Sequence, residues 1–106
     1  MADTMRIPQI KDVENALRIY YDRLELSNKD IRKLFPDVKS NATITRLKHI
    51  ARDLMVKESI LSLNPMYVNT QAAFRAWGID PEDLEARLTK LRRMKLTADR
   101  QVDINA

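Results

Sequence analysis

Glycine is nearly absent from this chain, and its scarcity limits the folds that the chain can adopt. Gly78 is the single glycine among 106 residues, and only four prolines are present. Sandwiches and barrels need many tight turns, which glycine and proline usually supply. Apolar residues make up 44% of the chain, enough for a small core. The composition therefore predicts a single all-α domain over residues 1–106, with about five helices.

Two short helices with clear start signals lie in the first half of the chain. Ser27 and Ser40 stand where helix N-caps belong, and Asp30 follows Ser27 at the spacing of a capping box. Pro36 ends the first helix because its ring disfavours the helical conformation of Phe35. The second helix carries apolar residues at spacings of three and four, and these predict a buried face: Ile44, Leu47, Ala51 and Leu54.

A third helix is predicted before these two, over about residues 10–24. Its apolar stripe has the same spacing and comprises Val13, Leu17, Tyr20, Tyr21 and Leu24. Together the three helices predict a core unit over residues 10–57.

The segment after this unit, residues 56–69, allows two interpretations. In the favoured one, the helix continues to about Leu63, and Asn64 caps a new helix with Pro65 at its first position. In the alternative, the two apolar runs form a very short β-hairpin around residues 60–68, which would make the fold a winged helix.

The C-terminal part, residues 64–96, is predicted to be a helical extension. One helix is expected over about residues 69–77, and Asp80-Pro81 predicts the start of another that ends near Leu96. Residues 97–106 show no periodicity and are predicted to be a flexible tail. The spacing of three leucines marks a candidate dimerisation seam: Leu84, Leu88 and Leu91.

Charge and residue content restrict the function. The net charge of +4 and the pI of about 9.6 favour polyanionic partners. The chain has no cysteine and one histidine, which removes most nucleophile–base pairs and metal sites, so we expect no enzyme, cofactor or metal. No apolar run approaches the ~18 residues that span a bilayer, and no secretory leader is evident, so we expect a cytoplasmic protein without a membrane partner.

Basic and polar residues concentrate on the helices that start at Ser27 and Ser40. On the second helix and just before it, five residues could contact base edges: Lys39, Asn41, Thr45, Arg46 and His49. Arg46 suits guanine and Asn41 suits adenine, because each matches the groups that the base exposes in the major groove. Five others could contact phosphates: Ser27, Lys29, Arg32, Lys48 and Arg52.

This region resembles the helix-turn-helix superfamily of DNA-binding proteins over roughly 30 of 106 residues. The resemblance rests on residue pairs at motif positions: Asp30-Ile31, Leu34-Phe35, Val38, Ser40, Thr43-Ile44 and Arg46-Leu47. It implies three packed helices, of which the third reads DNA. The usual turn glycine is replaced by Pro36-Asp37, and Arg32 stands where a small residue is common.

These observations predict a sequence-specific binder of double-stranded DNA, most simply a small transcriptional regulator from a bacterium, phage or mobile element. Such a regulator could form a homodimer. Two alternatives remain open. One is a DNA-packaging subunit similar to the small terminases of phages. The other is an adaptor whose basic face binds an acidic protein.

Overall fold

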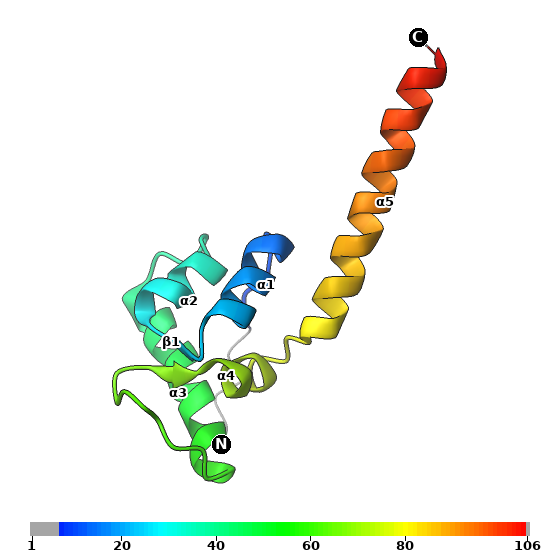
Figure 1. The fold of residues 1–106 in the computed structure, drawn as a ribbon. Coiled ribbons are helices and arrows are strands. Elements are labelled where there is room, and N and C mark those ends of the chain that lie inside the picture. Colours follow the sequence, from blue (N-terminus) through cyan, green and yellow to red (C-terminus); the bar gives the residue numbers. More distant parts are fainter. Residues whose placement is uncertain (1–6, 106) are drawn as a thin grey trace.

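The structure is a computed structural model that describes residues 7–105, with side chains up to Leu96. Within these residues, five helices and a two-stranded antiparallel sheet follow one another (Figure 1): α1 (Val13–Asp22), β1 (Glu25–Leu26), α2 (Asn28–Leu34), α3 (Asn41–Lys57), β2 (Val68–Asn69), α4 (Thr70–Ala76) and α5 (Pro81–Asn105). The prediction of an all-α domain with about five helices is confirmed. No helix in the described part combines the length and the apolar character that crossing a membrane requires.

The two predicted helix starts are confirmed. The Ser27 hydroxyl accepts the Asp30 N–H at 3.2 Å, and an Asp30 carboxylate oxygen accepts the Ser27 N–H at 3.0 Å, which completes a capping box. The Ser40 hydroxyl accepts the Ala42 N–H at 3.2 Å at the start of α3. Helix α2 ends at Leu34, immediately before the Phe35-Pro36 pair.

Helix α3 supplies the largest share of the core. Its residues Ile44, Leu47 and Ala51 are buried, as their spacing predicts. The indole N–H of Trp77 donates to the Leu47 carbonyl at 2.9 Å in the interior, and the Trp77 ring lies 5.6 Å from that of Phe35. One aromatic side chain thus joins the end of α4 to both α2 and α3, and its polar atom is satisfied.

Both interpretations of residues 56–69 are wrong. Helix α3 ends at Lys57, and residues 58–67 form a loop, which we call the 58–67 loop. Asn64 does not start a helix: its carbonyl accepts the Tyr67 N–H at 2.9 Å in a turn. Nor is there a hairpin within residues 60–68, because the strand that follows the loop pairs with β1, with Glu25 opposite Asn69 and Leu26 opposite Val68.

Part of the predicted stripe of α1 is also wrong. Tyr21 is 63% exposed and Leu24 is 78% exposed, whereas Ala16 and Ile19 are buried with Leu17. The helix ends at Asp22, and the next residue has extended backbone, so Leu24 no longer follows the helical period. Instead, the carbonyl of Leu24 accepts the Thr70 N–H at 3.0 Å beside the small sheet.

Helix α5 is longer than predicted. Its backbone is helical to Asn105, so the predicted end near Leu96 is wrong; Ala106 lies outside the described residues. The flexibility of residues 97–106 stays a prediction. The molecule measures 57 × 25 × 25 Å, because α5 leaves the globule beside α1 and α4 and points away from α2 and α3 (Figure 1).

Candidate nucleic-acid interface

The face of α3 opposite its buried stripe is open to solvent. All five residues predicted to contact bases are exposed: Lys39, Asn41, Thr45, Arg46 and His49. His49 lies four residues after Thr45 and three after Arg46, and both spacings make residues neighbours on a helix surface. The structure therefore brings these three together on one accessible ridge, while Lys39 and Asn41 lie at the start of the helix.

Asn41 is held by the preceding helix. The Arg32 guanidinium donates a hydrogen bond to its side-chain oxygen, which links α2 to α3. Two-point recognition of adenine uses both the oxygen and the amide of an asparagine. Arg32 would have to release the oxygen for Asn41 to read a base in this way. Arg32 itself is half-buried, so it is a weaker phosphate candidate than the exposed Lys29.

The two phosphate candidates on the flank of α3 bind the 58–67 loop. The Lys48 ammonium donates to the Met66 carbonyl at 2.6 Å, and the Arg52 guanidinium donates to the Pro65 carbonyl. Burial, and then the nearby charge of Arg52, lower the pKa of the Lys48 ammonium. Because both acceptors are neutral carbonyls, these two bonds bring no negative charge beside the ridge.

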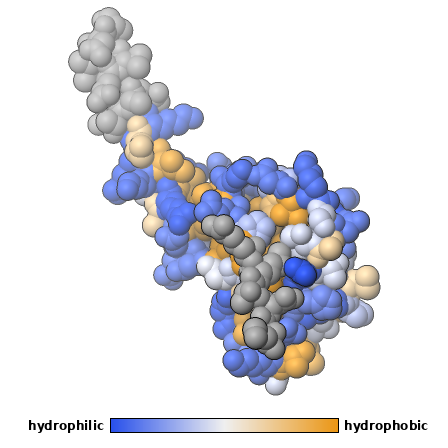
Figure 2. Space-filling view, turned by 180° about the vertical axis from the view of Figure 1, so that it is seen from behind, coloured by the Kyte–Doolittle hydropathy of each residue, from blue (hydrophilic) through white to orange (hydrophobic). Residues whose placement is uncertain are grey.

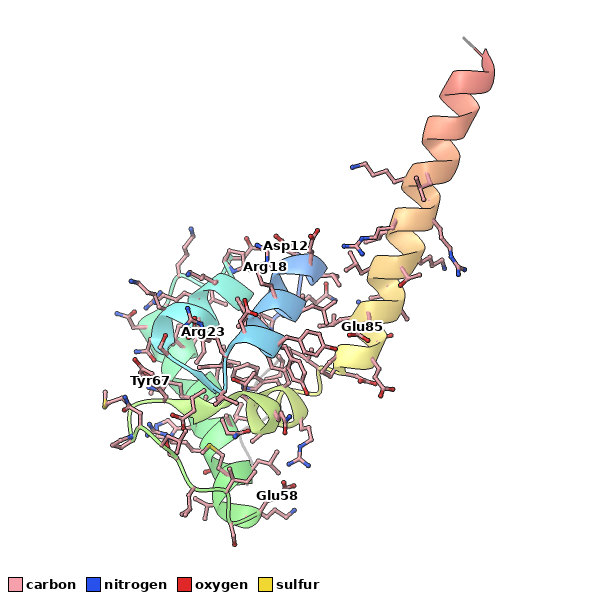
Figure 3. All side chains as sticks on the ribbon, viewed as in Figure 1. Asp12, Arg18, Arg23, Glu58, Tyr67 and Glu85 are labelled. Atoms are coloured by element: carbon pink, nitrogen blue, oxygen red, sulfur yellow. The ribbon has the colours of Figure 1, made fainter. Side chains whose placement is uncertain are left out.

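A carboxylate that the sequence analysis did not single out holds the middle of this loop. Glu25 accepts the N–H groups of Leu63 at 2.8 Å and Asn64 at 3.1 Å, and the hydroxyl of Ser62 at 3.1 Å. Glu25 also begins β1, so the loop is fixed to the sheet as well as to α3. Figure 3 labels Tyr67, the last residue of this loop. No local pattern reveals this role, because nearly forty residues separate the carboxylate from its donors.

The two acids between Ser27 and Arg52 are neutralised by residues outside that segment. Asp30 is buried in its capping box and lies 3.7 Å from the Arg23 guanidinium. Asp37, in the turn, forms an ion pair with Lys11, whose hydrogen bond and charge lower the pKa of that carboxyl. The basic side chains between Ser27 and Arg52 therefore meet little local opposition from these two acids, while the next acid along α3, Asp53, is exposed.

The predicted phosphate contacts at the start of α2 differ in availability. Lys29 is exposed in the first turn, whereas the Ser27 hydroxyl already accepts a backbone N–H as the cap. The exposed ammonium of Lys29 remains suited to an anion.

The three leucines of the predicted dimer seam lie in different environments. Leu84 belongs to the core, with 3% of its surface exposed, and Leu88 packs partly against it. Leu91 is 54% exposed. The outer end of this seam is thus accessible and its inner end is covered by the same chain.

Comparisons with protein-family models, with curated proteins and with solved structures found no match to this chain. Within the described residues, no group of three or more histidine or acidic side chains is arranged to hold a metal ion. The feature with the clearest chemistry is the polar, positively charged ridge of α3, flanked by Lys48 and Arg52.

Proposed function

We propose that this protein binds double-stranded DNA sequence-specifically, with α2 and α3 acting as a helix-turn-helix and α3 entering the major groove. A small cytoplasmic transcriptional regulator is the simplest protein of this kind. The observation that carries the proposal is the orientation of α3, which buries Ile44, Leu47 and Ala51 while Thr45, Arg46 and His49 stay accessible. A reading helix needs this division into a buried face and an exposed polar face.

The charges around the ridge support the same function. Arg46 can donate two hydrogen bonds to guanine, and Thr45 can contact a thymine methyl group or a phosphate. Lys29, at the start of α2, can pair with a phosphate beside the groove. The loop-bound Lys48 and Arg52 add to the positive field without leaving their carbonyl partners.

The experiment is a titration of labelled mixed-sequence duplex with the protein at several salt concentrations. A DNA-binding protein is expected to lose affinity steeply as salt rises, because each phosphate contact releases bound counterions. Lys29→Ala should weaken binding and flatten the salt dependence by about one unit of slope. Arg75→Ala, at an exposed position on α4, removes the same charge and serves as the matched control.

An adaptor for an acidic protein would show little duplex binding even at low salt, and this result would refute the proposal. Equal losses for Lys29→Ala and Arg75→Ala would indicate attraction by net charge alone and would contradict the assigned surface.

A further inference from the structure

The outer part of α5, of which side chains are described for residues 91–96, exposes apolar side chains that no other part of the described structure covers. Leu91, Met94 and Leu96 are 54%, 60% and 62% exposed, whereas Leu84, at the inner end of the same helix, is buried. Figure 2 shows apolar side chains along this part of the helix, flanked by hydrophilic ones. The apolar stripe that docks α5 onto the globule thus continues beyond it.

A helix in this position lacks its usual support. Helices shorter than roughly 12–15 residues are marginal in water without tertiary packing, and most helical stability comes from burying an apolar face. In the described structure only the first turns of α5 have such packing, against α1 and the core. The outer turns would gain stability if another surface covered Leu91 and Met94.

A groove runs beside the apolar stripe of α5. It lies between α1 and α5, has a volume of about 440 Å³, and is open to solvent. Leu17 and Leu88 contribute its apolar lining, and two acids and two arginines line it as well: Glu14, Glu85, Arg18 and Arg92. Such a groove suits a helix with an apolar stripe and charged flanks.

The outer part of α5 is itself a helix of this description. Its charges are sorted along the sequence: three acids lie in residues 82–85, and residues 86–98 contain five bases and no acid. A parallel pair of α5 helices would place like charges side by side. An antiparallel pair would bring the basic segment of one chain to the acidic first turns of the other.

We propose that α5 pairs with α5 of a second copy of this chain, antiparallel and about a two-fold axis near Thr89. Each outer segment then lies against the α1–α5 groove of the other copy and covers Leu91 and Met94. The same patch on both copies forms the interface, as two-fold symmetry requires. The pairing does not depend on DNA binding, since it uses the opposite side of the molecule from α3.

The first test is the mass in solution, measured by light scattering over a range of concentrations. The wild-type chain should have twice its monomer mass of 12.4 kDa. The double variant Leu91→Glu/Met94→Glu should be a monomer with an unchanged core. The control is Leu61→Glu/Leu63→Glu, which alters two leucines that are 89% and 81% exposed on the 58–67 loop and should leave the dimer intact.

A monomeric wild-type chain at high concentration would overturn the proposal. So would a dimer that resists the α5 variant or dissociates with the loop variant. Retained tryptophan burial, followed by the fluorescence of Trp77, shows that the variants are folded.

The second test determines the orientation with single cysteines, because the natural chain has none. Thr89→Cys lies near the proposed axis and should form a disulfide with its own copy on mild oxidation. Glu82→Cys and Leu96→Cys should each remain uncoupled alone and should cross-link when mixed. Efficient self-coupling of Leu96→Cys would indicate a parallel pair and contradict the antiparallel arrangement.

Discussion

At the scale of single residues, Asp30 and Thr70 show what burial demands of a polar group. Both side chains are buried, but Asp30 serves the cap of α2 and lies close to the Arg23 guanidinium. The Thr70 hydroxyl has no hydrogen-bond partner among the described residues. A buried hydroxyl without a partner costs free energy, because it loses its bonds to water and gains none in return.

Thr70→Val should therefore stabilise the protein. The substitution keeps the branched shape and replaces the buried hydroxyl with a methyl group, so we expect the free energy of unfolding to rise by about 1 kcal/mol. Urea denaturation measures it. Thr45→Val is the control, because Thr45 is exposed on α3 and should change stability little. A loss of stability for Thr70→Val would indicate that the hydroxyl has a partner.

The residues of the proposed DNA-binding surface are expected to make different kinds of contact. Arg46→Ala should cost about 1–3 kcal/mol at one base pair and relax the sequence preference there, because a two-point contact to guanine is lost. Lys29→Ala should weaken all duplexes alike, since a phosphate carries no sequence information. Affinities for a selected site and its single-base variants measure both effects. A uniform loss for both proteins would contradict this assignment.

At the scale of elements, the helices that local signals define were predictable and the 58–67 loop was not. Ser27, Ser40 and Pro36 act within a few residues of themselves, so spacing alone locates the ends of α2 and the start of α3. The loop instead depends on Glu25 and on Lys48 and Arg52, which are distant in sequence. Propensity cannot reveal such partners, and the apolar runs around Asn64-Pro65 suggested elements that do not form.

The same reasoning explains which site residues could be foreseen. The helical period of α3 located its exposed ridge, because burial of one face implies exposure of the other. The engagement of Lys48 and Arg52 with loop carbonyls, and of Asn41 with Arg32, could not be read from spacing. These contacts exist only because tertiary folding brings the loop and α2 beside α3.

The loop should loosen when its carboxylate anchor is removed. Glu25→Ala deletes the acceptor for the amides of Leu63 and Asn64, and the loss of roughly 1.4 kcal/mol would raise their hydrogen-exchange rates about tenfold. Exchange followed by NMR measures this change. Glu58→Ala, which removes the partner of Arg75 at the first residue of the loop, should leave the two amides unchanged. Equal effects of both substitutions would argue against a specific anchor.

The docking of α5 on α1 should depend on pH. Tyr21 donates a hydrogen bond to Glu85, which is labelled in Figure 3. This bond, followed by burial and the charge of Glu85, raises the pKa of the Tyr21 phenol above its usual 10.0. The folded state therefore holds the proton more tightly than the unfolded state. The stabilisation is complete below pH 10 and is lost as pH rises through the raised pKa.

Tyr21→Phe removes this contribution and its pH dependence. Urea unfolding of both proteins at pH 9 and at pH 11 measures the effect: the wild type should lose more stability than the variant across this interval. The same loss in both proteins would show that the bond between Tyr21 and Glu85 does not stabilise the folded state.

At the scale of the whole molecule, two separate surfaces are available for partners. The exposed ridge of α3 lies on the globule, and the exposed stripe of α5 lies on the helix that leaves it, pointing away from α2 and α3 (Figure 1). This separation lets a pair of chains joined through α5 keep both α3 ridges free. Such a pair is expected to bind one duplex at two half-sites, one for each α3.

The most direct test of the central claim is an NMR titration of the isotope-labelled protein with duplex DNA that contains its selected site. The account predicts that the largest changes in backbone amide shifts fall on residues 39–49 and on the first turn of α2. The amides of α1 and of the core should change little. Changes concentrated on α1 or α5, with α3 unaffected, would contradict the assignment of α3 as the element that reads DNA.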